Sequence, residues 1–284
     1  MPAPVPESGR QATGPYAPSD QTRSNLYFGP ANVTWAGELS VSATSAPVFR
    51  YHEPSTAAAD QFAASLGATL QFRPAGYLGS YAGHDFTLQV RATVQAPARE
   101  PWFSLVASAS AQPADGAAPA DAAGAFLVAH SLAPAWPNVV TVDAAGDQAK
   151  VRYLRRFPVP AYGDAYLVDG EGERYGLEVD LNGGRLALVS GPLPVSLDFA
   201  DYPIISADQA VRSALASSPA APGNINPPPA VRLTAAELVY VVVAAGDHTF
   251  YEPAFLFSGS FLLGGMTYEK RVLVPAVDPS QRSS

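Results

Sequence analysis

The sequence predicts an α+β protein made of repeated units, each an antiparallel sheet that carries one packed helix. First, short Ala-rich helix patterns are followed more than once by strands with alternating apolar residues. Second, Pro (28) and Gly (23) are abundant and only 15% of the 284 residues are charged, which is typical of a chain rich in strands and turns. Third, 48% of the residues are hydrophobic, which is enough for a buried core in one or two domains.

The predicted organisation is three helix-and-sheet units between two terminal segments. The N-terminal segment is rich in Pro, Ser, Gly and Gln and has no apolar periodicity, so we expect a flexible leader or tether. The predicted ranges are a leader over 1–25, an N-terminal β-rich unit with one helix over 26–107, a second helix-plus-sheet unit over 120–198, a C-terminal unit over 199–278 and a tail over 279–284.

In the first unit, Ser55 can cap a helix that runs from Ala57 to Leu66. The apolar residues of that segment recur on one helical face, which indicates a helix packed on a sheet. Alternating apolar residues then predict a strand over 86–90, and Trp102 begins a further strand.

In the second unit, Asp121 can cap a helix from Ala122 to Ser131, which ends before Pro134. The Asn182-Gly183 pair lies between two alternating apolar runs. It is a strong hairpin signal because both central positions of such a turn need positive φ. We expect this hairpin to join strands over 175–180 and 185–189. Two further strands are expected over 139–142 and 149–157.

In the third unit, a helix is expected from Ala207 to Ser217, ending before Pro219. A Pro-rich connector over 220–229 follows. Apolar, β-branched and aromatic residues then predict strands over 238–243, 251–259 and 270–277.

Four segments of the C-terminal unit carry a resemblance to a known family. They are Tyr-Pro-Ile-Ile-Ser-Ala-Asp-Gln-Ala at 202–210, Leu-Val-Tyr at 238–240, Tyr-Glu-Pro-Ala-Phe-Leu-Phe-Ser-Gly at 251–259 and Val-Pro-Ala-Val at 274–277. With them the unit resembles the PepSY-like unit of bacterial extracytoplasmic proteins. Related units occur in the YycH and YycI regulators and in many secreted lipoproteins.

The resemblance implies a bacterial protein located outside the cytoplasmic membrane, in the cell envelope or secreted. Members of this group act mostly by binding, as inhibitors of proteases or modulators of sensor kinases, and they share no catalytic motif. We therefore expect a non-enzymatic binding or regulatory protein that acts on an unidentified envelope protein. Two alternatives are a hydrolase with a His/Asp site between units and a carrier of a small apolar ligand.

Composition excludes several other classes of protein. The formal net charge of −8 disfavours binding to nucleic acid, which needs a basic face, and to anionic membrane surfaces. The chain has no cysteine, so disulfides, thiolate metal sites and cysteine nucleophiles are excluded. The longest uncharged stretch, 122–142, contains Pro134 and Pro137, so we expect no membrane span. The polar leader fits an N-terminal anchor or export signal that has been removed.

No residue pattern indicates a catalytic, cofactor or metal site, and we expect none of the three. His52, His84 and His248 each adjoin an acid, but no pair of histidines has the helical spacing of a metalloprotease site. The run from Asp169 to Glu173 is similar to the start of a calcium loop. It lacks the spacing of the later oxygen ligands, so a solvated turn is favoured.

Three arginines, Arg152, Arg155 and Arg156, form the one basic cluster. In a strand, Arg152 and Arg156 share a face while Arg155 points to the other side. The cluster can bind a carboxylate or phosphate group, or it can pair with acids of the same chain. The excess of acidic over basic residues, 25 to 17, favours pairing.

The strand over 251–259 contains the predicted partner contacts. Pro253 cannot donate a ladder hydrogen bond, so we expect this strand to begin at an edge or margin of its sheet. An extended segment of a partner can add to such an edge by main-chain pairing. The contact residues would be Tyr251, Glu252 and Phe255; in the alternative interpretation the segment only packs the sheet margin onto the core.

Overall fold

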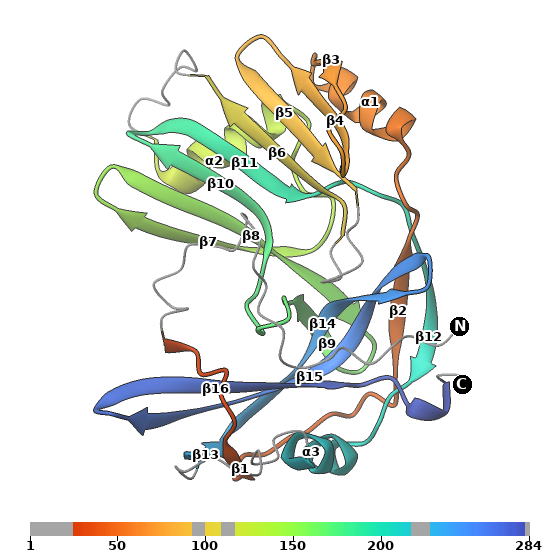
Figure 1. Ribbon diagram of the computed structural model, residues 1–284, viewed down its shortest axis with the longest axis vertical. Helices are drawn as coiled ribbons and strands as arrows, with labels where there is room; N and C mark the ends of the chain where they lie inside the picture. The colour runs from red at the N-terminus through yellow and green to blue at the C-terminus, as the bar shows by residue number, and fades with distance from the viewer. Residues whose placement is uncertain (1–24, 93–99, 109–116, 217–227, 282–284) are drawn as a thin grey trace.

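The computed structural model describes residues 25–92, 100–108, 117–216 and 228–281, and these form a mainly β protein (Figure 1). Within these ranges, fourteen strands join in one mixed sheet, two more form a small second sheet, and three α-helices pack around them. The predicted class, an α+β fold of repeated antiparallel sheets with one helix each, is therefore wrong. Strands from all three predicted ranges pair with one another, because free backbone groups along a strand need hydrogen-bond partners wherever in the chain these lie.

The upper half of the sheet in Figure 1 has the strand order β7-β8-β10-β11-β6-β5-β4-β3. Two helices, α1 (Thr56–Ser65) and α2 (Pro119–Ala129), pack against this half. The bounds of its strands are β3 (Thr69–Phe72), β4 (Tyr77–Ala82), β5 (Phe86–Arg91), β6 (Trp102–Ala107), β7 (Asn138–Ala145), β8 (Gln148–Val159), β10 (Gly176–Asn182) and β11 (Arg185–Pro192).

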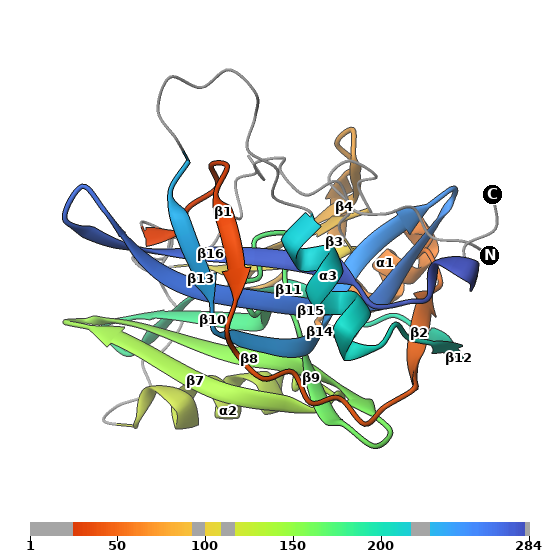
Figure 2. The same cartoon turned by 90° about the horizontal axis from the view of Figure 1, so that it is seen from below.

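The lower half continues from β8 in the order β9-β14-β15-β2-β12, with β16 on β15. The parallel pair of β1 and β13 and the helix α3 (Ala207–Ala216) lie beside it (Figure 2). The bounds of these strands are β1 (Asn32–Trp35), β2 (Ser45–Tyr51), β9 (Gly163–Leu167), β12 (Leu197–Pro203), β13 (Ala230–Leu233), β14 (Ala235–Ala245), β15 (His248–Leu263) and β16 (Met266–Pro275), followed by a 3₁₀ turn at Pro279–Gln281.

The long strand β8 connects the two halves. Its first part pairs with β7 on one side and β10 on the other, and its last residues, from Arg156 to Val159, pair with β9. The strand therefore leaves one half of the sheet and enters the other without a loop between them.

Each half has its own hydrophobic core. In the upper half, Leu88, Phe103 and Val179 pack against α1 and α2. In the lower half, Tyr240 and Phe255 belong to a cluster that includes residues of α3. Side chains of this size contribute about 1.5–3 kcal/mol each when fully buried, so both halves are held mainly by apolar burial.

Short-range patterns in the sequence predict the approximate positions of the three helices and of one hairpin. The Ser55 side chain caps α1 by accepting a hydrogen bond from the Ala58 N–H at 3.1 Å, as predicted. The predicted β10–β11 hairpin is confirmed, but its turn lies one residue later than the Asn182-Gly183 pair: Asn182 pairs with Arg185, and the positive φ values, 57° and 75°, belong to Gly183 and Gly184. The expected cap at Asp121 is wrong: α2 starts earlier, at Pro119, because proline suits the first helical position, and Asp121 lies in the first turn.

The expected sheet-margin position of Pro253 is also wrong. Strand β15 pairs with β14 along this whole region, and its other side pairs first with β2 and then with β16. The last residue paired with β2 is Tyr251, and the first paired with β16 is Ala254. Pro253 lies between these two neighbours, so its missing N–H costs no ladder hydrogen bond even in the interior of the sheet.

Candidate functional site

The upper half of the sheet has one face covered by helices and one face free of them. Ala59 of α1 and Leu127 of α2 belong to the same core cluster, so both helices lie on the same face. The third described helix, α3, contacts β16 and β1 of the lower half. Among the described residues, the opposite face of the upper sheet therefore has no helix on it, and we call it the polar face.

A row of polar side chains crosses the polar face from strand to strand. Neighbouring residues in the row are cross-strand partners, and such partners share a face of the sheet. The row runs from β7 to β4 through Thr141, Arg152, Glu178, Ser190, Ser104, Gln89 and Ser80. The next row along the strands points to the helices and is apolar, consisting of Val151, Val179, Val189, Leu105, Leu88 and Tyr81.

One end of the polar row is charged. The Lys150 Nζ lies 2.6 Å from Glu178 Oε1 and 3.7 Å from an Asp180 carboxylate oxygen, and the Arg152 Nε lies 3.3 Å from Glu178 Oε2. Burial raises the pKa of Asp180, and the neighbouring negative charge of Glu178 raises it further. Two cations and two carboxylates thus form a balanced network at this end.

An aromatic border runs beside the polar row. Trp102, Arg91 and Tyr77 are cross-strand partners on β6, β5 and β4. The Arg91 guanidinium lies over the Tyr77 ring at 4.6 Å and donates a hydrogen bond to its hydroxyl. Tyr, Trp and Arg are the side chains enriched in the central parts of binding interfaces. Three members of the polar row, Ser80, Ser104 and Ser190, are buried, so the part of this face that is open to a partner includes the half-buried border and the half-buried Gln89, Arg152 and Glu178.

A cluster of the buried residues Glu100, Arg155 and Tyr251 and the half-buried Tyr175, which we call the junction cluster, lies where the two halves meet. The Arg155 Nη1 donates to the Tyr251 hydroxyl at 3.0 Å, and that hydroxyl donates to Glu100 Oε2. The Arg155 Nη1 also lies 3.9 Å from Glu100 Oε2. Glu100 is only 4% exposed and Arg155 6%, so the ion pair is removed from solvent.

Burial dominates the electrostatics of the junction cluster. It raises the pKa of Glu100 to about 7, although the charge of Arg155 and the hydroxyl of Tyr175 act in the opposite direction. Burial also lowers the pKa of Arg155 and raises the pKa of Tyr175 well above its ordinary value. A cluster that is closed to solvent in this way can stabilise the junction between the halves but offers no surface to a ligand.

The expectation that the three arginines pair with acids is confirmed. Arg152 pairs with Glu178, Arg155 with Glu100, and Arg156 with Asp164 at 3.0 Å. Arg155 points away from the other two, into the apolar side of β8, as the alternation predicted. Sequence reasoning missed Glu100 and Tyr175. The one signal in the sequence is Arg155 itself, a single arginine among the inward-facing residues of β8. A buried arginine needs a buried acid as its partner, but the sequence does not indicate which acid that is.

The predicted partner contacts lie inside the molecule. Tyr251 belongs to the junction cluster, Phe255 is fully buried in the lower core, and Glu252 is 3% exposed. Their role as partner contacts stays a prediction, and it would require β15 to separate from its neighbours.

The four histidines have four different surroundings. His52 and His84 each pair with an acid at 2.8 Å, His248 Nδ1 lies 3.1 Å from an Arg50 nitrogen, and His130 packs on the Phe126 ring. Hydrogen bonding to Asp85 raises the pKa of the exposed His84. Within the described parts of the chain, no group of three or more potential metal ligands comes together.

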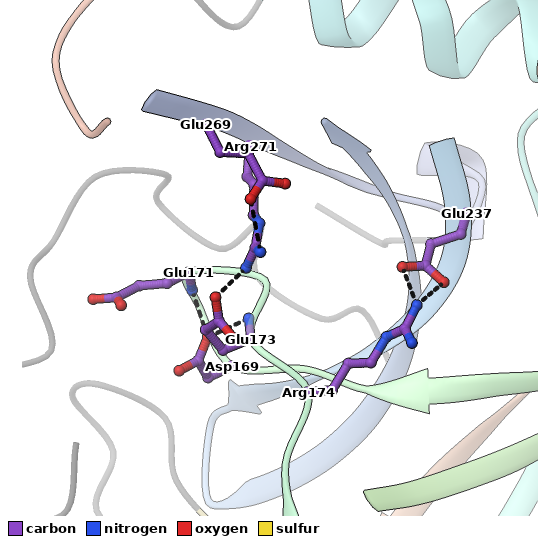
Figure 3. A network of polar contacts seen from close by, with 7 residues as sticks. All are labelled: Asp169, Glu171, Glu173, Arg174, Glu237, Glu269 and Arg271. Carbon is purple, nitrogen blue, oxygen red and sulfur yellow. Dashed lines mark hydrogen bonds and ion pairs between the residues drawn. The ribbon is translucent and has the colours of Figure 1, made fainter. Parts of the chain in front are cut away.

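The acidic run from Asp169 to Glu173 forms a turn that is held by contacts of Asp169 and Glu173 within the protein (Figure 3). The Asp169 Oδ1 accepts hydrogen bonds from the N–H groups of Glu171 and Glu173, both at 2.9 Å. Glu173 pairs with Arg271 of β16 at 2.5 Å. The run therefore ties the connection before β10 to the lower half of the sheet.

Comparison with known proteins gives weak structural likenesses only. No protein-family model matches the chain, and no curated protein matches it. It is similar to an uncharacterized protein from Eubacterium rectale, with 8% identity, a TM-score of 0.41 and coverage of 86% of this chain and 87% of that one. It is also similar to the YpeB C-terminal domain of Bacillus megaterium, with 13% identity, a TM-score of 0.30 and coverage of 80% of this chain and 94% of that one. None of the described helices is long and apolar enough to cross a membrane.

Proposed function

We propose that this chain is a bacterial extracytoplasmic protein that binds and regulates another envelope protein without catalysing a reaction. The observation that carries the proposal is the polar face, where a polar row crosses seven strands beside an aromatic border. The half-buried border and the half-buried Gln89, Arg152 and Glu178 are groups of this face that can contact a partner, while the three serines of the row are buried.

The chemistry of the polar face favours binding over catalysis. Its charged residues, Lys150, Arg152, Glu178 and Asp180, are held in mutual ion pairs. General acid–base or nucleophilic catalysis needs a reactive group next to an activating neighbour, as in a nucleophile–base pair. The serines of the row face Gln89, Glu178 or one another, with no histidine among their cross-strand partners. The resemblance of the C-terminal unit to PepSY-like units adds support for a regulatory role in the envelope.

The test compares two exposed or half-buried sites on opposite faces of the upper half. Gln89→Lys places a charge in the polar row. Val128→Lys places the same charge on the solvent-exposed side of α2, which covers the opposite face of the sheet, and Val128 there is 70% exposed. Each variant and the wild-type chain would be cross-linked to envelope proteins of the source bacterium and the captured proteins identified. We expect Gln89→Lys to lose a specific partner that wild type and Val128→Lys both retain, with all three melting temperatures alike. Equal capture by both variants, or substrate turnover by the purified chain, would contradict the proposal.

A further inference from the structure

The large sheet ends in four outer strands, and one of them differs from the rest. Within the described residues, β3, β7, β12 and β16 each have a strand neighbour on one side only. Outer strands carry free N–H and C=O groups that can pair with another chain, and proteins usually protect them by shortness, charge, proline or coverage.

Three of the four outer strands are protected. Strand β3 has only four residues. Strand β12 carries two aspartates and ends in Pro203. Strand β16 carries three consecutive charged residues, and the Tyr27 N–H donates to its Glu269 carbonyl at 2.8 Å.

Strand β7 has the weakest protection of the four, and no described segment pairs with its outer edge. It pairs with β8 along all eight residues, contains no proline, and has one charged residue, Asp143. Val140 is 44% exposed and Val142 47% exposed. Their cross-strand partners, Tyr153 and Val151, face the core, so both valines lie on the helix side of the sheet. Figure 1 shows β7 as the outermost strand of the upper half, with its outer edge away from β8.

We propose that β7 pairs in antiparallel fashion with β7 of a second copy of this chain, about a two-fold axis at Val142. An isologous pair of this kind needs a self-complementary strand. In this register residues 139–145 of each copy pair, which uses nearly the full strand. On the helix side, Val142 faces Val142 of the second copy and Val140 faces its Ala144, so apolar side chains meet apolar side chains.

The same register also makes the charges of the other face complementary. Asp143 of one copy faces Thr141 of the other, so the two aspartates do not meet. Thr141 is the cross-strand partner of Arg152, and Asp143 that of Lys150. Each aspartate would then lie between its own Lys150 and, beyond the short Thr141 side chain, the second copy's Arg152. That arginine is two strand spacings away, roughly 10 Å. Its Nε lies 3.3 Å from Glu178 of β10, on the other side of β8, so it attracts the second copy's aspartate at long range and does not form a direct ion pair with it.

The pairing concerns one strand per copy, so the interface is smaller than that of a permanent dimer. We expect a reversible dimer that forms as the concentration rises. Because β7 carries the contact, dimerisation does not depend on whether the polar face binds an envelope partner. Sedimentation velocity of the full chain would measure its mass from low to high micromolar concentration. The monomer has a mass of 29.6 kDa, and the measured mass should rise toward twice that value as the concentration increases.

Charge substitutions at the axis test the register directly. V142K and V142E each place two like charges opposite one another, and we expect each to raise the dimer dissociation constant at least tenfold, which is about 1.4 kcal/mol. An equimolar mixture of the two variants should recover the dimer, because the introduced ammonium and carboxylate groups then face each other. Leu70→Lys, on the outer strand β3 where Leu70 is 43% exposed, is the matched control and should leave dimerisation unchanged.

The measurements can overturn the proposal in three ways. The wild-type chain can stay monomeric over the whole concentration range, L70K can weaken the dimer as much as V142K, or the mixture of V142K and V142E can fail to recover it. Melting curves of each variant show that it is folded, so that a loss of dimer is not a loss of structure.

Discussion

The guanidinium of Arg155 donates a hydrogen bond to the hydroxyl of Tyr251 at 3.0 Å, and this contact joins the two halves of the molecule. Arg155 lies on β8, where the upper half ends, and Tyr251 on β15 in the lower half. The Tyr251 hydroxyl in turn donates to Glu100, so one tyrosine links a buried cation to a buried carboxyl group. Breaking this chain of contacts should affect the stability of both halves.

Replacing Arg155 tests the buried ion pair. Arg155→Met leaves Glu100 buried without its cation, and removing one partner of a buried pair costs about 3–5 kcal/mol of unfolding free energy. Arg156→Met is the control, since Arg156 forms a more exposed pair with Asp164, worth up to about 1 kcal/mol. Urea unfolding of the two variants measures the difference. Similar losses in both would show that the junction cluster adds nothing special to stability.

The pKa of Glu100 predicts a pH dependence of stability with a definite sign. The folded-state pKa of Glu100 is raised from 4.5 to about 7, so between these pH values the folded chain holds a proton that the unfolded chain has lost. The contribution of Glu100 to stability is therefore largest at or below pH 4.5 and falls as the pH rises toward 7, by roughly 3 kcal/mol in total.

The matching measurement compares the wild-type chain with Glu100→Gln across this pH range. Glutamine does not titrate, so the difference in unfolding free energy between the two proteins isolates the carboxyl group. We expect wild type to lose stability relative to Glu100→Gln as the pH rises. A difference that stays constant from pH 4.5 to 7 would mean that the carboxyl group is not held in a desolvated site.

A buried hydroxyl in the lower half offers a second stability test. Tyr240 is fully buried, and its hydroxyl donates to the Pro47 carbonyl oxygen at 2.7 Å. Tyr240→Phe leaves that buried carbonyl without this donor and should cost about 1–3 kcal/mol. Tyr27→Phe removes a more exposed bond to the Pro30 carbonyl and should cost less than about 0.5 kcal/mol. Equal melting temperatures for the two variants would contradict the expectation that the buried hydrogen bond of Tyr240 contributes more to stability than the exposed one of Tyr27.

The histidines test the proposal that the protein is not an enzyme. The His84 side chain is 95% exposed and pairs with its neighbour Asp85, and His248 contacts Arg50. We expect His84→Ala and His248→Ala to leave the activity in a cell assay in place, and metal analysis of the purified chain to find no stoichiometric zinc. About one equivalent of bound metal, or loss of activity in both variants, would favour a hydrolytic site instead.

Features that depend on neighbouring residues could be predicted from the sequence. The cap at Ser55, the hairpin between β10 and β11 (though not the exact turn residues) and the inward direction of Arg155 follow from short-range hydrogen bonding, backbone conformation and strand alternation. The helix over 207–216 begins where the sequence placed it, because its signals lie within a single turn of backbone.

The tertiary structure decided how these pieces combine. Pairing of β2 with β15, of β9 with β14 and of β6 with β11 joins strands far apart in the chain, and a strand carries no local mark of the neighbour it will take. For the same reason the sequence predicts a sheet margin at Pro253, whereas this residue lies between two successive neighbours of an interior strand. The sequence by itself therefore determined the local elements and the faces of the strands. The continuous sheet, the partner of Arg155 and the polar face arose from contacts between distant segments, which only the packed chain brings together.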